Sequence, residues 1–215
     1  MLESGHTIAD YQIVTPLDEN QLFTSYQVTG PSIEVAKLLL LDVEQLVDKK
    51  SRQTFIAQAQ LLCGQSFPGL CSLIAADCND EHSYCLYPMP AGAPLSDWLN
   101  RGFRVRESLE LVRSLAAHLG PAHASGLWHG AISPATIYLD DQGVSLDQFA
   151  LASLLRLDFN SGIDPCYSSP ELVRGEPLST ASDLYSLGIL LYRLLVGKVP
   201  FAEDEPFATA MLHVQ

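Results

Sequence analysis

Short runs of alternating hydrophobic and polar residues fill the first ninety positions, a pattern that predicts β-strands. YQIVTPL (11–17) and FTSYQVTG (23–30) are rich in β-branched and aromatic residues, and the polar residues between them predict a turn. IEVAKLLLL (33–41) predicts a third strand, and residues 69–89 contain two more around a polar turn. Within this region, residues 43–64 carry apolar side chains at helical spacing and end at a glycine, which predicts one helix.

From Pro94 onward the pattern changes to that of helices. A short helix is expected over residues 95–102 and a longer amphipathic one over 106–126. Residues 136–149 predict a β-hairpin, because two apolar runs flank the turn Asp-Asp-Gln-Gly. Residues 178–197 are apolar on nearly all sides, which predicts a helix buried inside the domain.

The order of these elements predicts an α+β fold with two lobes. A small, mostly antiparallel β lobe with one helix (residues 1–88) precedes a larger, mainly helical lobe (residues 89–215), and a cleft is expected where the lobes meet. A chain of 215 residues is long enough to bury a core in each lobe.

Charge and composition exclude several classes of function. The net charge of −13 argues against binding nucleic acid or docking on an anionic membrane surface. Five cysteines without a CxxC pair predict neither a disulfide framework nor a zinc site. The N-terminus does not read as a signal peptide and no apolar run is long enough to span a bilayer, so we expect a cytoplasmic domain, or the cytoplasmic part of a membrane protein.

Several segments, in one order, resemble the protein kinases, and in particular the bacterial serine/threonine kinases that are similar to eukaryotic ones. These segments are FIAQAQLL (55–62), PAGAPLSDWL (90–99), AHASGLWHGAISPATIYLDDQG (122–143), CYSSPEL (166–172) and SDLYSLGILLYRLLVGKVPF (182–201). The resemblance implies the two-lobed kinase fold. The chain ends inside a segment similar to one of the family's later helices, so the helices that follow it in the family are expected to be absent.

The resemblance also places the family's catalytic positions, and most of them hold another side chain here. In the catalytic loop, His129 to Thr136, the base aspartate corresponds to Ala131, the nearby lysine to Ser133 and the magnesium-binding asparagine to Thr136. The magnesium-binding aspartate of the D-F-G motif corresponds to Gln148. No metal site is therefore expected.

The nucleotide-binding positions are changed as well, with one exception. The run that matches the glycine-rich loop, residues 18–23, contains no glycine, and the helix glutamate corresponds to Gln58. The threonine near the end of the activation segment corresponds to Asp164. Lys37 matches the family's phosphate-binding lysine and is the candidate nucleotide contact, although a cleft lysine with a local partner is the simpler interpretation.

The positions that hold the family's fold are kept. His129 and Phe149 match two of the stacked apolar side chains that join the family's lobes. Glu171 matches the glutamate at the end of the activation segment, and Asp183 matches the aspartate that holds the catalytic loop. In the family, the arginine that pairs with this glutamate lies in the helices beyond the segment where this sequence ends, so Glu171 is expected to lack that partner. Asp147, next to Gln148, is a candidate substitute ligand, but strand alternation predicts that its side chain points away from the cleft.

A kept frame with exchanged catalytic side chains predicts a catalytically inactive domain, a pseudokinase, that serves as a protein-interaction or regulatory module in bacterial signalling. The alternative is a weak or atypical ATP-dependent serine/threonine kinase, or a nucleotide sensor, that uses Lys37. No cofactor is expected, with ATP in the absence of magnesium left open. A protein partner is expected, without nucleic acid or direct membrane contact, and attachment to a longer or membrane protein fits the resemblance.

Overall fold

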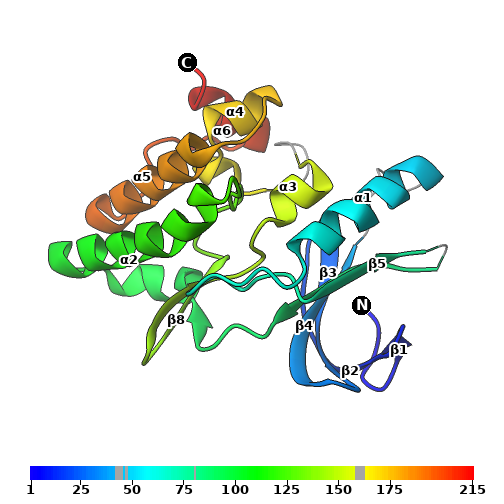
Figure 1. Cartoon of the computed structure of the whole chain (residues 1–215). Helices are drawn as coiled ribbons and strands as arrows, with labels where there is room; N and C mark the ends of the chain where they lie inside the picture. Colours follow the sequence, from blue (N-terminus) through cyan, green and yellow to red (C-terminus); the bar gives the residue numbers. More distant parts are fainter. Residues whose placement is uncertain (42–45, 47, 80, 158–162) are drawn as a thin grey trace. The chain divides into compact units, whose positions relative to one another are not determined.

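The computed structural model describes residues 1–41, 46, 48–79, 81–157 and 163–215. These residues form two compact units (Figure 1). The N-terminal unit comprises Met1–Ser66 and Cys71–Pro90, and the C-terminal unit comprises Phe67–Leu70 and Ala91–Gln215. The domain boundary between residues 88 and 89 stays a prediction. No helix in the described ranges is long and apolar enough to cross a membrane.

The N-terminal unit is a six-stranded antiparallel sheet with one helix, α1 (Lys49–Leu62), packed against β5. Along the sheet the strands are β1 (Thr7–Ile8), β2 (Tyr11–Glu19), β3 (Phe23–Gly30), β4 (Ile33–Leu41), β6 (Ser83–Pro88) and β5 (Ala75–Cys78). The sequence pattern predicts all of these except the two-residue β1, which is too short to show a period. The predicted start of the helix, before Asp48, falls partly outside the described residues.

One face of this sheet carries the core of the N-terminal unit. Tyr26 and Val28 of β3 lie opposite Leu38 and Ala36 of β4, and all four are buried. Successive side chains of a strand point to opposite faces, so Lys37, between Ala36 and Leu38, points to the other face. Burial of each large apolar side chain contributes about 1.5–3 kcal/mol. The core therefore fixes the direction in which Lys37 projects.

The C-terminal unit is mainly helical, with one small sheet in the order β7-β8-β9. Its elements are β7 (Ala93–Pro94), the 3₁₀ helix η2 (Leu95–Arg101), α2 (Val105–Ala124), β8 (Ile137–Asp140), β9 (Gly143–Leu146), α3 (Leu151–Leu155), the 3₁₀ helix η4 (Pro165–Tyr167), α4 (Pro170–Arg174), α5 (Thr180–Val196) and α6 (Pro206–Leu212). Helices α2 and α5 lie side by side (Figure 1). The α+β kinase-like architecture predicted from the sequence is confirmed.

Helix α5 begins and ends where its sequence predicts. The Ser179 side chain accepts a hydrogen bond from the Ala181 N–H in a capping box, and Gly197 ends the helix in the left-handed conformation. The prediction that the helix is buried on all sides is wrong. Among the described residues, four of its large apolar side chains are exposed, and they share one face of the helix: Leu184, Tyr192, Leu195 and Val196.

The β8–β9 hairpin positions the residues that follow it, among them Gln148 and Phe149. The carboxylate of Asp140 accepts hydrogen bonds from the N–H groups of Gln142 and Gly143, so this side chain builds the turn. At the other end of the hairpin, the Leu146 N–H donates to the carbonyl of Gly69 at 2.8 Å. Gly69 has φ +74°, and a Cβ there would lie 2.1 Å from the His118 ring. Only glycine fits this crossing.

Candidate nucleotide site and catalytic loop

Lys37 lies in the middle of the N-terminal sheet, on β4 between Gln27 of β3 and Tyr87 of β6. Its side chain is 6% exposed. A lysine side chain is a compact positive charge on a flexible stem, and burial in a sheet restricts where that charge can go. Gln58, the residue that matches the family's glutamate, is half-buried on α1.

The β2–β3 hairpin, which matches the glycine-rich loop, is closed by its own side chain. The carboxamide oxygen of Asn20 accepts the N–H groups of Leu22 and Phe23 at 2.8 and 3.1 Å, and the Asn20 N–H donates to the Phe23 carbonyl. In a glycine-rich loop, backbone N–H groups bind the phosphates. Here three of these donors are already used, so this turn offers a phosphate fewer contacts.

The catalytic loop of the C-terminal unit is held by one carboxylate, Asp183 of α5. Its Oδ2 accepts the N–H of His129 at 2.9 Å and lies 2.8 Å from Nε2 of His123 on α2, and its Oδ1 accepts the N–H of Gly130 at 2.8 Å. Asp183 is 1% exposed. Hydrogen bonds to a buried charge are stronger than neutral ones, so these contacts fix the loop to two helices.

The Asp183 contacts also explain Gly130, which has φ +78°. A Cβ at this position would lie 2.6 Å from Leu178 and 2.9 Å from Ala152. Glycine is therefore the residue that lets the loop bend toward α5.

His129 uses both ring nitrogens inside the loop. Its Nδ1 accepts the N–H of Ala131 at 3.2 Å, so Nε2 carries the proton and donates to the carbonyl of Asp147 at 2.8 Å. Burial lowers the pKa of His129, against the opposing attraction of Asp183. The imidazole is neutral and fully engaged, which makes it a structural group and not a general base.

Thr136, at the magnesium-asparagine position, closes the loop instead of facing a metal. Its hydroxyl lies 3.1 Å from the carbonyls of Ala131 and Ser133, and accepts the Ser133 N–H at the same distance. Ser133 and Thr136 are buried, and Ala131 is half-buried. The Asp147 N–H donates to the Thr136 carbonyl at 2.8 Å, which joins the loop to the end of β9.

The residues after β9 adopt an unusual backbone. Gln148 and Ala150 have φ +59° and +63°, a region that costs a non-glycine residue about 1–2 kcal/mol. Between them the buried Phe149 ring packs edge-on against Phe67 and His129, with centroids 5.6 and 6.3 Å apart. Packing of this ring holds the strained turn in place.

Asp147 lies at the start of this turn, beyond the last residue of β9. It is fully buried, and its Oδ1 accepts the N–H of Gln148 at 2.8 Å. The alternation of side chains along β9 ends at Leu146, so it does not predict the orientation of the Asp147 side chain. The turn after β9 thus holds a buried carboxylate next to the position where the family has its magnesium ligand.

Glu171 is bound by a side chain of α5. Ser182 of α5 donates from its hydroxyl to Oε2 of Glu171 at 3.2 Å. The end of the activation segment is therefore tied to the same helix that carries Asp183.

Comparison with known proteins identifies this frame. The sequence model of the protein kinase domain matches residues 35–214. The chain belongs to the protein kinase domain family. It is similar to the "Probable serine/threonine-protein kinase PknB" of Lactococcus lactis, with 24% identity over 100% of this chain and 36% of the relative. The serine/threonine-protein kinase PrkC of Bacillus subtilis is 28% identical over 85% of this chain and 29% of its own length.

The solved structure of the PknI kinase domain from Mycobacterium tuberculosis has the same fold. Its TM-score is 0.78 at 24% identity, and the match covers 95% of this chain and 80% of that one. The present chain spans about a third of the length of the two bacterial relatives.

The prediction that the chain is not an enzyme is wrong. The protein kinase domain covers most of the sequence, and the relatives are named serine/threonine-protein kinases. The inference failed because it took the exchange of catalytic side chains as loss of activity, although the residues that hold the fold are kept. The structure shows that the frame beneath them is intact: Lys37 lies in its strand, Asp183 holds the loop, and Thr136 closes it.

We predict that Asp183→Asn lowers the free energy of unfolding by about 3 kcal/mol, because an amide loses the charge and turns a donor toward N–H groups. Urea denaturation followed by circular dichroism measures this. The exposed Asp141→Asn is the matched control and is expected to stay within about 0.5 kcal/mol of the wild type. Equal free energies of unfolding for the two variants would contradict the prediction, because they would show that the contacts of Asp183 contribute little to stability.

We predict that Ala150→Gly raises the free energy of unfolding by about 0.5–1 kcal/mol, because glycine adopts the left-handed conformation without strain. Ala152→Gly, in the following helix, is the control and should lower it by about 1 kcal/mol or more. The same denaturation assay applies, and a loss of stability in both variants would contradict the strained turn.

Proposed function

We propose that this domain is an atypical, slow ATP-dependent serine/threonine protein kinase in which Lys37 is the main phosphate contact. The observation that carries the proposal is a buried lysine in the middle of the sheet, at the position of the family's phosphate-binding lysine. Its ammonium group is the kind of charge that holds phosphate oxygens. Since the β2–β3 turn uses its own N–H groups, a larger share of phosphate binding falls on Lys37.

The braced loop supports the same proposal. Phosphoryl transfer needs positioning and charge stabilisation more than covalent chemistry from the protein. Asp183, His129 and Thr136 fix the backbone of the loop even though the reactive side chain is gone. A fixed loop is what positions an acceptor hydroxyl.

In the proposed reaction, the acceptor hydroxyl oxygen bonds to the γ-phosphorus as the bond from that phosphorus to the bridging oxygen of ADP breaks. The hydroxyl proton passes to water or to the phosphate, because Ala131 cannot accept it. Loss of a positioned base lowers the rate by about 10²–10⁴-fold. The expected turnover is therefore far below the typical rates of protein kinases.

The residues at the family's magnesium positions do not fit two protein-bound ions. Magnesium prefers carboxylate and other oxygen ligands. The hydroxyl of Thr136 is engaged within its loop, Gln148 offers an amide, and Oδ1 of Asp147 already accepts a backbone N–H. No step of the proposed reaction depends on a magnesium ion held by the protein.

The setting of the domain follows from the same proposal. A kinase needs ATP and a protein that carries the acceptor residue, so the cytoplasm is the compartment and a protein substrate is the partner. Relatives about three times as long suggest that the domain works as part of a longer protein. Nucleic acid is not a partner in this proposal, because the net charge is −13.

We predict that Lys37→Met abolishes transfer of the γ-phosphate to serine or threonine, because the phosphate loses its cation. Purified protein is incubated with MgATP and a generic acceptor protein, and phosphorylated residues are quantified by mass spectrometry. Lys49→Met, at an exposed position of the same unit, is the control and should retain wild-type activity. Transfer that survives Lys37→Met would contradict the proposal. ATP binding by the wild type without any transfer would replace the kinase with a nucleotide sensor.

A further inference from the structure

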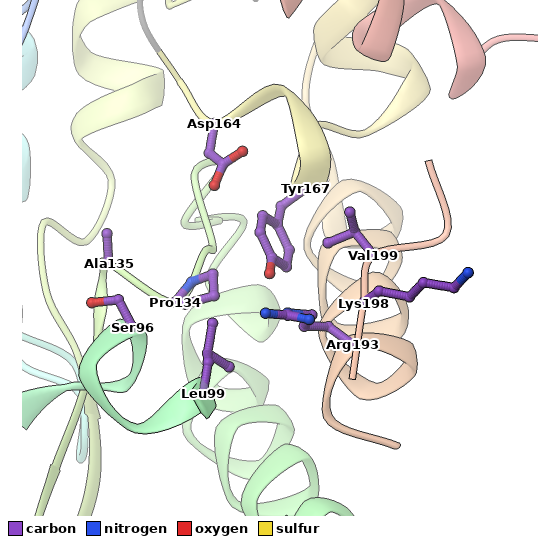
Figure 2. Close-up of a pocket in the computed structure, with 9 residues that line it drawn as sticks. All are labelled: Ser96, Leu99, Pro134, Ala135, Asp164, Tyr167, Arg193, Lys198 and Val199. Carbon is purple, nitrogen blue, oxygen red and sulfur yellow. The ribbon is translucent and has the colours of Figure 1, made fainter. Parts of the chain in front are cut away.

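A cavity of about 390 Å³ opens beside the catalytic loop, entirely within the C-terminal unit (Figure 2). Pro134 and Ala135 of the loop form one wall, and Ser96 and Leu99 of η2 form another. Tyr167 of η4 closes it on a third side. Ala135 is exposed and contributes only a methyl group, which leaves room for an incoming side chain next to the loop.

The walls of this cavity are tied to one another. The Ser96 N–H donates to the carbonyl of Pro134 at 3.1 Å, which joins η2 to the catalytic loop. The hydroxyl of Ser186 on α5 donates to the carbonyl of Tyr167 at 2.7 Å. The catalytic loop is also held on α5 by Asp183. The loop and Tyr167 are therefore both attached to α5, and η2 is attached to it through the loop. The cavity is therefore preformed, as binding sites usually are.

Arg193, in the last turn of α5, places a positive charge in the cavity. Figure 2 shows its guanidinium group reaching between Leu99 and Tyr167, whereas the ammonium group of Lys198 points away. The Tyr167 side chain lies beside this guanidinium group. Burial and the nearby Asp164 raise the pKa of the Tyr167 phenol, so the phenol adds no negative charge beside Arg193.

The acidic residues near the cavity bear on how strongly Arg193 attracts an anion. Asp164 is the one carboxylate among the lining residues, and its Oδ1 accepts the N–H of Cys166 at 3.0 Å. Among the residues that the structure describes, no carboxylate forms an ion pair with Arg193. The acidic residues Glu203 to Glu205 follow Lys198 in the chain but do not line the cavity. In a chain with 12 basic residues and 25 acidic ones, an arginine in a cavity without an ion-pair partner among the described residues is a candidate contact for an anion.

We propose that this cavity binds an anionic side chain of the substrate protein, a carboxylate or a phosphate close in sequence to the acceptor serine or threonine. A guanidinium group presents parallel N–H donors that match both anions, and the apolar walls strengthen the interaction by excluding water. A lysine or arginine of the substrate would be repelled here, in spite of the strongly negative net charge of the chain. The role in substrate choice rests on the proposed kinase function, but the binding of the anion does not.

The test is peptide binding in the absence of nucleotide, measured by fluorescence anisotropy. Four labelled peptides share one serine acceptor and differ at the flanking positions, which hold glutamate, phosphoserine, glutamine or lysine. We expect the glutamate or phosphoserine peptide to bind about tenfold or more tightly than the glutamine peptide, and the lysine peptide to bind most weakly. The stronger of the two anionic peptides identifies the source of the anion.

Substitutions of Arg193 test whether this side chain causes the preference for anionic peptides. Arg193→Gln should remove the preference for anionic peptides, and Arg193→Lys should keep part of it, since the charge remains while the paired donors are lost. Arg113→Gln, at an exposed position of α2, is the control and should bind as the wild type does. Melting curves of each variant verify that it is folded.

Equal affinity of the wild type for the glutamate, phosphoserine and glutamine peptides would overturn the proposal whatever the variants do. A preference that persists in Arg193→Gln would overturn the assignment to this cavity. Failure of phosphate transfer would refute the kinase function alone, because peptide binding is measured without ATP.

Discussion

The carboxylate of Asp183 is the contact on which the rest of the C-terminal unit depends. It is buried on α5, receives two backbone N–H groups of the catalytic loop and lies against His123 of α2. A buried charge is stable only when such partners surround it, so loop and helices hold one another. From the loop, His129 extends the network to the carbonyl of Asp147, and Phe149 packs beside it. Figure 1 shows α2 and α5, the two helices that carry His123 and Asp183, side by side.

This arrangement separates the frame of the site from its reactive groups. The loop conformation depends on backbone N–H groups, on a neutral histidine and on the hydroxyl of Thr136, none of which needs a catalytic aspartate. Reactive side chains can therefore be exchanged while the loop keeps its shape. The same support on α5 also shapes the cavity around Arg193, through Ser186 and Tyr167. Binding of nucleotide and recognition of a substrate anion are thus separate properties in the proposed account.

Local patterns predicted most of the secondary structure, because each element follows from side chains near in sequence. The Ser179 cap and the Asp140 turn are examples. Period and composition could not predict the β2–β3 turn closed by Asn20 or the positive φ of Ala150, which depend on individual hydrogen bonds and on packing. The cavity was missed because Ser96, Pro134, Tyr167 and Arg193 are distant in sequence and meet only in the fold. The sequence also showed which catalytic side chains are exchanged, but it could not show the hydrogen bonds that hold the loop without them.

The measurement that tests the central claim most directly is calorimetric titration of the wild-type protein with ATP. If a buried Lys37 and a braced loop are enough to retain a nucleotide, ATP should give saturable heat with a dissociation constant of about 1 mM or tighter. The absence of saturable heat at millimolar ATP would mean that the kinase fold is kept while ATP binding is lost, and would contradict the account.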